Sequence, residues 1–243
     1  MKAILFAVLV ACLVGANPAS AQIPTTFTNL QVLPKDITRA ELVSTMRDIA
    51  GALGVRCAHC HVGPDNLQGM NFATDERPVK VAARTMLQMV RTINADFISK
   101  VPAGDTKRQQ VTCFTCHRRE AKPPLPLHEV LLATANASGA TAALAQYRTL
   151  RTEMLDAGVY DFREHSLAIL SLFLNQQKRF DDALEVLKVN AEFFPKSVRT
   201  QLLLGETSAQ KGNIEQAVAY YSRALELDPA NAEAKAALAK LKK

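Results

Sequence analysis

Two copies of the pattern Cys-x-x-Cys-His constrain this chain more than any other feature, and they run from Cys57 to His61 and from Cys113 to His117. Two thiols three residues apart on one turn can each form a thioether bond with a haem vinyl group, and the adjacent histidine then reaches the iron. The motifs therefore predict two covalently attached c-type haems. The predicted attachment and iron-binding residues are Cys57, Cys60, His61, Cys113, Cys116 and His117.

Cysteine pairs with this spacing also occur in disulfides, redox dithiols and zinc sites. A four-cysteine zinc site does not require a histidine directly after each pair, so it leaves His61 and His117 unexplained. A thioredoxin-like dithiol needs a strand-to-helix setting in an α/β fold, and neither motif has that pattern around it. Every cysteine outside the first 21 residues belongs to a motif. Haem attachment is the interpretation that uses every motif residue.

The first 21 residues have the pattern of a signal peptide. Met1-Lys2 gives a positive start, residues 3–14 are apolar, and residues 19–21 form a small-x-small cleavage site. The apolar run is too short to span a bilayer comfortably. Because covalent haem attachment takes place outside the bacterial cytoplasm, the leader predicts an exported, periplasmic protein. Residues 9–12 resemble a lipoprotein box, so a lipid anchor at Cys12 is the alternative.

Composition gives no sign of a nucleic-acid-binding protein. The chain has 29 basic and 23 acidic side chains, and the leader carries one of the lysines. The propionates of two haems would bring the remaining positive charge closer to zero. No cluster of lysine or arginine is interleaved with aromatic residues, and tryptophan is absent. We therefore expect protein partners rather than nucleic acid.

A proline-rich break divides the chain. Pro123, Pro124 and Pro126 block helix continuation, and small residues follow at 134–141. We expect a dihaem cytochrome c domain at 22–121, a proline- and alanine-rich linker at 122–140, and a helical domain at 141–243. The predicted fold class is mostly α, with little regular sheet in the haem domain.

Each haem motif follows a predicted amphipathic helix that carries methionine. The first helix spans 36–53, with a capping box formed by Thr38 and Glu41 at its start and Gly54 at its end. The second spans 78–98 and starts at a proline. Its predicted apolar stripe includes Val81, Met86, Met89, Val90 and Ile93. A thioether can occupy the sixth position of a haem iron, although a methionine on such a stripe is also a common core residue.

Four segments of this half form a recognisable series, at 27–34, 53–57, 83–94 and 111–118. Together they resemble the photosynthetic reaction-centre cytochrome c subunit family over about residues 27–125. In that family a helix with a methionine ligand precedes the haem motif. The resemblance implies that Met46 pairs with His61 at the first haem and that Met86 pairs with His117 at the second. Met89 lies one turn from Met86 and is the alternative ligand.

The chain also departs from that family. The best-known members carry four haems and dock on a photosynthetic reaction centre, whereas this chain has two motifs and none in its second half. The family's bis-histidine haem takes a histidine from a region that corresponds to 99–101, where this chain has none. We expect His59, His128 and His165 to be surface or core residues rather than iron ligands. The resemblance therefore implies a dihaem electron-carrier module, and the photosynthetic role of the family is not carried over.

In the second half, residues of the same type recur 34 positions apart, as Pro195 and Pro229 illustrate. That period is typical of tetratricopeptide (TPR) repeats, and two copies are predicted at 164–197 and 198–231. Stacked repeats usually offer a concave surface to a partner protein. This function rests on analogy between folds and identifies no partner.

Helices of the helical domain follow from the same pattern. The second repeat predicts helices at 200–211 and 214–227, and further helices are expected at 142–157 and 232–243. Because two repeats are few for a stable stack, we expect these flanking helices, or the haem domain, to cover the ends.

The sequence thus predicts an exported dihaem cytochrome that carries single electrons between redox partner proteins, with a TPR domain that docks it in a membrane-associated complex. It predicts an electron-transfer protein rather than an enzyme. One alternative is a dihaem enzyme, such as a peroxidase, with one open haem iron. Another is a redox-sensing or assembly scaffold in which the TPR domain is primary. The sequence does not decide whether the protein forms a homo-oligomer.

Overall fold

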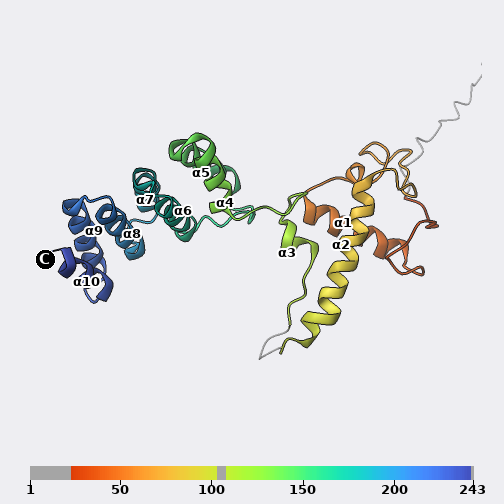
Figure 1. Ribbon diagram of the computed structural model, residues 1–243. Coiled ribbons are helices and arrows are strands. Elements are labelled where there is room, and N and C mark those ends of the chain that lie inside the picture. Colours follow the sequence, from red (N-terminus) through yellow and green to blue (C-terminus); the bar gives the residue numbers. More distant parts are fainter. Residues whose placement is uncertain (1–22, 103–107, 242–243) are drawn as a thin grey trace, which may run out of the picture. The chain divides into compact units, whose positions relative to one another are not determined.

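The computed structural model describes residues 23–102 and 108–241 and divides the chain into two compact units, Met1–Thr115 and Cys116–Lys243 (Figure 1). Helices are the only regular elements in these residues, apart from an isolated bridge between Val62 and Asn71. The predicted class, mostly α with little regular sheet, is confirmed. The expected signal peptide and the alternative lipidation site, Cys12, lie outside the described residues.

Helix α1 (Arg39–Leu53) begins and ends where its capping residues predict. The Glu41 backbone N–H donates to Thr38 Oγ1 at 3.3 Å, and the Glu41 carboxylate accepts from the Thr38 N–H at 3.0 Å. Gly54 ends the helix in the left-handed conformation, with a φ of 66°, which a residue without a side chain adopts at little cost. The chain therefore leaves the helix just before the first haem motif.

Helix α2 (Pro78–Thr92) continues through a π-helical turn, η2 (Ile93–Phe97), and a 3₁₀ turn, η3 (Ile98–Lys100). Figure 1 shows this series as one long rod, as expected from the sequence. The predicted apolar stripe, however, is not a core. Met86 and Met89 are 40% and 43% exposed, and the buried residue of α2 is Lys80.

Apolar burial in the first unit is slight. Among its described residues, Leu42, Ala52 and Met70 are the only buried apolar side chains. Burial of apolar surface is the main force that stabilises a folded domain. The first unit consequently depends more on polar contacts, described below, than the second unit does.

The second unit is a stack of helical hairpins. Helix α4 (Leu127–Ser138) packs on α5 (Ala140–Met154), α6 (His165–Gln176) on α7 (Phe180–Phe193), and α8 (Val198–Gln210) on α9 (Ile214–Leu227). Helix α7 also packs on α8, and the last helix, α10 (Ala232–Leu241), packs on α9. These are the green-to-blue helices of Figure 1. The predicted repeat helices are confirmed to within two residues, and the flanking helices cover both ends of the stack.

The stretch expected to be a linker, 122–140, is mostly helix α4. Leu127, Leu131 and Ala135 recur every four residues and are buried in a cluster with side chains of α5 and α6. The small residues at 134–141 suit a close helix pair as well as a flexible segment, so composition alone suggested a linker. Residues 123–126, which precede the helix, have no regular secondary structure.

A small residue sets the distance between α8 and α9. A Cβ atom at Gly205 would lie 2.8 Å from Cε1 of Tyr221, which is closer than such atoms approach in proteins. Tyr221 is buried in a cluster with Ala217 and Ala224 of the same helix. The TPR pattern of a glycine in one helix and a tyrosine in the next is therefore a packing requirement.

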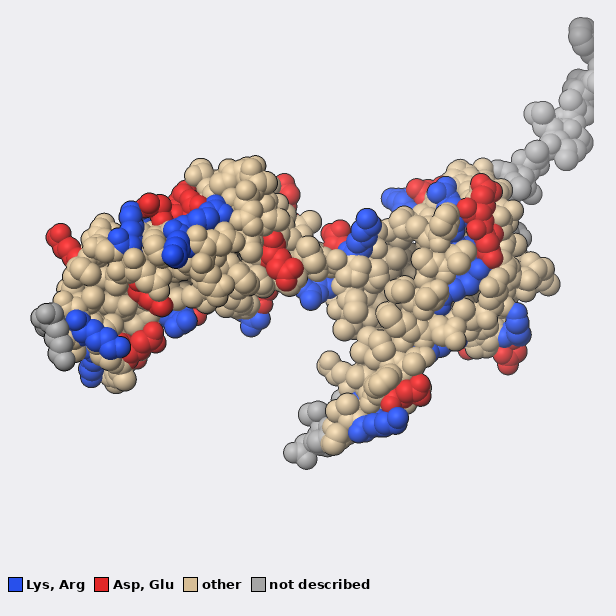
Figure 2. Space-filling model, viewed as in Figure 1, with Lys and Arg blue, Asp and Glu red and all other residues tan. Residues whose placement is uncertain are grey.

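Charged side chains of both signs are interspersed over the visible face of the second unit (Figure 2). The same view of the first unit shows a broad area without charged side chains. In the described residues, no helix combines the length and the apolar character needed to cross a bilayer.

Candidate haem-attachment sites

The first haem motif is a single tight turn that starts just after α1. Residues Cys57–His59 form the 3₁₀ turn η1, and the N–H groups of Cys60 and His61 donate to the Cys57 carbonyl at 3.2 and 3.0 Å. These hydrogen bonds gather Cys57, Cys60 and His61 on one turn, as the spacing predicts. Burial raises the pKa of the Cys60 thiol, so this group is protonated near neutral pH.

The His61 imidazole is half-buried against Phe72. The two ring centroids lie 5.0 Å apart and the rings meet edge to face. Burial lowers the pKa of His61, and the positive charges of Lys80 and Arg84 lower it further. The imidazole is therefore neutral at pH 7, which is the form that binds a metal ion. Its Nδ1 atom is buried and has no hydrogen-bond partner within the described part of the chain.

The loop that carries Phe72 is held by close backbone contacts. The Asn71 N–H donates to the Val62 carbonyl at 2.7 Å, which brings the loop back to the end of the motif. Gly63, with a φ of 142°, lies so close to Met70 that a Cβ atom there would be 2.6 Å from Met70 Cα. Lys80 then donates to the Phe72 carbonyl at 2.8 Å. The result is a fixed wall for His61.

Asp75 is the centre of a polar network that connects this loop to α2 and to the N-terminal segment. Arg84 donates two hydrogen bonds of 2.8 Å to its carboxylate, and Lys80 forms an ion pair with it at 3.2 Å. Asn29 and Gln31 donate to the same carboxylate at 2.9 and 3.3 Å. The hydrogen bonds from Arg84, followed by those from Lys80, hold the pKa of Asp75 well below its usual range. The carboxylate is consequently ionised at any pH near neutral.

Sequence reasoning missed Phe72, Asp75 and Lys80. A loop aspartate, a loop phenylalanine and a helical lysine form no local pattern, because their partners lie at distant positions in the chain. The one available signal was indirect. Arg84 and Asn29, which both bond to Asp75, belong to two of the segments that resemble the cytochrome family.

The second haem motif is a helical turn, α3 (Cys113–His117). Asn94, in the π-helical turn after α2, fixes the backbone that leads into it. Its side chain donates to the Val111 carbonyl at 2.7 Å and accepts from the Val111 N–H at 2.8 Å. Asn94 is a further residue that the sequence interpretation did not single out, and π-helical turns often mark functional positions.

The His117 imidazole is oriented by a backbone carbonyl. Its Nδ1 atom lies 2.9 Å from the Glu120 carbonyl oxygen, which can only accept, so Nδ1 carries the proton. The Glu120 N–H donates in turn to the His117 carbonyl at 2.8 Å. Arg118 and Arg119 complete this turn with φ values of 50° and 69°, a conformation that is unusual for side chains of their size. The turn leaves Nε2 of His117 as the nitrogen that can bind a metal ion.

The residues present fit c-type haem. Among the described residues, Cys57, Cys60 and Cys116 are thiols that form no disulfide, and His61 is a half-buried neutral imidazole whose buried Nδ1 atom has no hydrogen-bond partner. Met46 lies half-buried on α1, and Met86 and Met89 present exposed thioethers from α2. No group of three or more His, Cys, Asp or Glu side chains in the described residues is arranged to hold a metal ion by itself.

Two of the other histidines, His128 and His165, contact side chains of the second unit. The His128 ring stacks on Phe173 with ring centroids 6.0 Å apart, and His165 lies 3.4 Å from the Asp161 carboxylate.

Comparison with known proteins places this arrangement in a family. The family model described as "photosynthetic reaction centre cytochrome C subunit" matches residues 7–176, well over half of the chain. The chain belongs to this family. It is therefore a c-type cytochrome, and the resemblance predicted from the sequence is confirmed.

Three curated relatives match this family member over part of its length. Cytochrome c-554 of Chloroflexus aurantiacus is 43% identical over 90 residues, which cover 37% of this chain and 20% of the relative. The photosynthetic reaction center cytochrome c subunits of Thermochromatium tepidum and Roseobacter denitrificans are 34% and 30% identical, over 40% and 41% of this chain. The chain spans only 22% and 27% of the length of those two subunits.

The second half of this cytochrome matches a tetratricopeptide repeat model over residues 174–241, which confirms the predicted repeat. Among solved structures, the first TPR domain of Spaghetti (RPAP3), bound to an HSP90 peptide, aligns with a TM-score of 0.33 at 22% identity. That alignment covers 48% of this chain and 87% of the other.

Proposed function

We propose that this protein is an exported dihaem c-type cytochrome that carries single electrons between redox partner proteins. The observation that supports this most is the pair of Cys-x-x-Cys-His turns in which the described structure gathers the motif residues. A bound haem supplies reversible one-electron chemistry at its iron. The protein's part is to attach the group, to supply the iron ligands and to present it to partners.

Each motif residue has a proposed role. Cys57 and Cys60, and likewise Cys113 and Cys116, hold the two haems by thioether bonds. His61 and His117 bind the irons from one side through a neutral imidazole nitrogen. The hydrogen bond from His117 Nδ1 to the Glu120 carbonyl keeps that ring in one tautomer and orientation.

The methionines complete the proposed ligand set. Met46 on α1 is proposed for the first haem and Met86 on α2 for the second, with Met89 as the alternative one turn away. A thioether in the sixth position keeps small molecules from the iron, so it favours electron transfer over peroxide chemistry. The exposure of Met86 and Met89 supports a ligand role, because a core methionine would be buried.

The TPR unit is proposed to dock the cytochrome on its partners, which we place in a membrane-associated complex. Its three hairpins and terminal helix form a self-contained stack, the architecture that TPR proteins use to bind other proteins. The proposed organisation is a signal peptide at 1–21, a dihaem domain at 22–121 and a helical domain up to residue 243. Because the chain spans about a quarter or less of its curated relatives, a photosynthetic partner is not carried over.

One preparation tests the proposal. The full chain is expressed in a host that matures c-type haems, and its mass and haem content are measured. Near-infrared magnetic circular dichroism of the ferric protein and a potentiometric titration follow. We expect two haems per chain, two low-spin irons with histidine and methionine ligands, and two reversible one-electron steps.

Other results would support the rivals. One high-spin iron with an open position would indicate a dihaem enzyme such as a peroxidase. Two low-spin irons with partner binding that depends on their oxidation state would indicate a redox-sensing scaffold. Fewer than two haems would contradict the proposal itself.

A further inference from the structure

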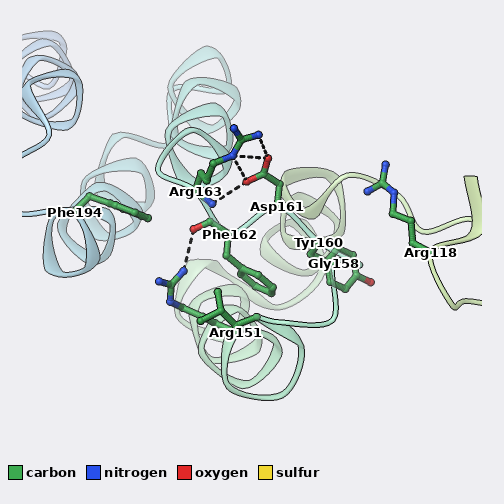
Figure 3. A pocket seen from close by; sticks show the side chains of 9 residues that line it. Arg118, Arg151, Gly158, Tyr160, Asp161, Phe162, Arg163 and Phe194 are labelled. Atoms are coloured by element: carbon green, nitrogen blue, oxygen red, sulfur yellow. Dashed lines mark hydrogen bonds and ion pairs between the residues drawn. The ribbon is translucent and has the colours of Figure 1, made fainter. Parts of the chain in front are cut away.

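The second unit contains a pocket of about 480 Å³ (Figure 3). One of its lining residues, Arg118, directly follows the second haem motif in the sequence. Its lining includes Arg118, Arg151, Tyr160, Phe162, Arg163 and Phe194. A neighbouring pocket of about 490 Å³ shares Arg151 and Leu155 with it. Together these two hollows, which we call the arginine pocket, combine positive charge with aromatic and aliphatic surface.

Arg151 is held rigidly in this pocket. Its Nη1 donates to the Phe162 carbonyl at 2.9 Å and to the Tyr147 hydroxyl at 3.3 Å. The guanidinium carbon also lies 4.5 Å from the ring centroid of Phe193 and 5.8 Å from that of Phe194. Cation–π contacts of this kind fix the plane of a guanidinium. Because Arg151 is ordered already, little conformational entropy is lost when a carboxylate binds to it.

Arg118 reaches the same pocket from the residue directly after His117. Its Nη1 donates to the Val159 carbonyl at 3.1 Å, and its left-handed backbone is part of the turn that orients His117. Figure 3 shows Arg118 on the segment that follows α3, and Arg151 with its guanidinium directed at the Phe162 carbonyl. The pocket thus joins the helical hairpins to the turn of an iron-binding histidine.

Only some of the positive charge in this pocket is neutralised. Asp161 accepts hydrogen bonds from Arg163, which lower the pKa of that carboxyl to about 2, so these two residues cancel. Arg148 forms an ion pair with Glu192 at 2.6 Å. Within the described part of the chain, neither Arg118 nor Arg151 has a carboxylate partner, and each keeps N–H groups that can donate to a ligand.

We propose that the arginine pocket binds an acidic segment of a redox partner protein. One carboxylate of the segment pairs with Arg118 and another with Arg151, while an apolar side chain packs on Phe194 and Leu155. Two separate cations and an apolar lining suit an extended peptide better than a small anion. The inference deepens the docking role proposed above and rests on it, and it places the acidic partner next to the turn that carries His117.

Calorimetry tests this with defined probes. The holoprotein is titrated with a hexapeptide of alternating glutamate and leucine, and with the same peptide containing glutamine in place of glutamate. We expect the acidic peptide alone to bind, and its affinity to fall when the salt concentration rises from about 20 to about 200 mM, since salt screens such pairs. Arg118→Gln should weaken binding about threefold because it is exposed, and Arg151→Gln about tenfold because it is half-buried.

Arg199→Gln is the matched control, because Arg199 lies on α8 outside the pocket and pairs loosely with Glu233 at 3.8 Å. It should leave the affinity unchanged. Circular dichroism checks the fold of each variant, and if Arg151→Gln does not fold, Arg118→Gln and the glutamine peptide decide. Equal binding of both peptides, or equal loss in Arg118→Gln and Arg199→Gln, would overturn the site. No binding at all would also overturn it, while the two redox steps of the proposed cytochrome would be unaffected.

Discussion

The two units of this cytochrome are stabilised by different forces. The second unit buries three apolar clusters between its helices, and Leu131, Leu187 and Ala217, one from each cluster, are fully buried. In the described part of the first unit the buried apolar residues are few, and a polar network around Asp75 connects its loops and helix. The first unit also presents Met86 and Met89 on its surface. The second unit therefore has an apolar core of its own, whereas we expect the first to depend on the proposed haems to complete one.

The largest effect is expected from removal of the haems. A variant with all four motif cysteines replaced by alanine cannot attach them. Because a bound group that stabilises only the folded state adds its binding energy to stability, we expect the first unit to lose its cooperative fold. Hydrogen exchange measured by mass spectrometry should show fast exchange in residues 23–102 and unchanged protection in α4–α10. If both units of this variant were equally protected from hydrogen exchange, the first unit would not depend on the proposed haems.

A packing change in the second unit should destabilise that unit and leave the first unit unaffected. Gly205→Ala inserts a methyl group 2.8 Å from the Tyr221 ring, and overpacking of this kind costs more than the gain in helix propensity. We expect a net loss of about 1–2 kcal/mol in the free energy of unfolding of the second unit. Denaturant unfolding followed by far-UV circular dichroism measures this loss, and the haem absorption spectrum should not change.

Gly51→Ala is the matched control in the other unit. No atom lies within 4 Å of a Cβ at this position on α1, so the gain in helix propensity should stabilise the first unit by about 0.5–1 kcal/mol. If both glycine variants destabilise their units equally, close packing is not what distinguishes Gly205.

The stability of the first unit at low pH tests the contribution of the polar network around Asp75. The pKa of Asp75 is lower in the folded protein than its ordinary value of 3.8, so its stabilising effect is fully present above that value. The effect is lost as the pH falls below 3.8 towards the folded-state pKa. Asp75→Asn should lower the thermal midpoint of the first unit by roughly 3–8 °C at pH 7 and make it less dependent on pH below 4. Melting curves followed at the haem bands give both quantities.

Asp161→Asn provides the equivalent change in the second unit. Hydrogen bonds from Arg163 lower the pKa of Asp161 to about 2, so this carboxyl also stabilises above its ordinary value of 3.8 and loses its effect as the pH falls. The variant should alter the acid sensitivity of α4–α10 and leave the haem bands alone. A haem-band transition that responds to Asp161→Asn as strongly as to Asp75→Asn would argue against a network confined to the first unit.

Local signals predicted much of this fold, and contacts between distant residues account for the rest. Thr38 with Glu41, Gly54 and Pro78 each mark a helix boundary by chemistry within one turn. The Asp75 network, in contrast, joins positions as far apart as 29 and 84, and no local pattern reports such pairing. Helix α4 was missed because its second half consists of alanine and other small residues, a composition that is equally typical of a linker. The methionine ligands stay predictions from family resemblance.

The smallest expected effect is a difference in reduction potential between the two proposed haems. Among the described residues His61 Nδ1 has no acceptor, and the charges of Lys80 and Arg84 act on the ring, whereas His117 Nδ1 donates to the Glu120 carbonyl. A hydrogen bond of that kind makes an imidazole a stronger donor to the metal and favours the oxidised iron. Nearby positive charge favours the reduced iron. We therefore expect the first haem to have the higher reduction potential, so that electrons pass from the second haem to the first.

Lys80→Met tests this asymmetry, because it removes a positive charge near His61 while keeping an apolar stem of similar length. The potential of the first haem should fall and that of the second should stay constant in a potentiometric titration with the two haems assigned by spectroscopy. Lys235→Met, on the exposed face of α10, should change neither potential. If the second haem shifted with the first, or if the first did not shift, the potential difference would have to come from the sixth ligands. The methionines at Met46 and Met86 would then be the next residues to exchange.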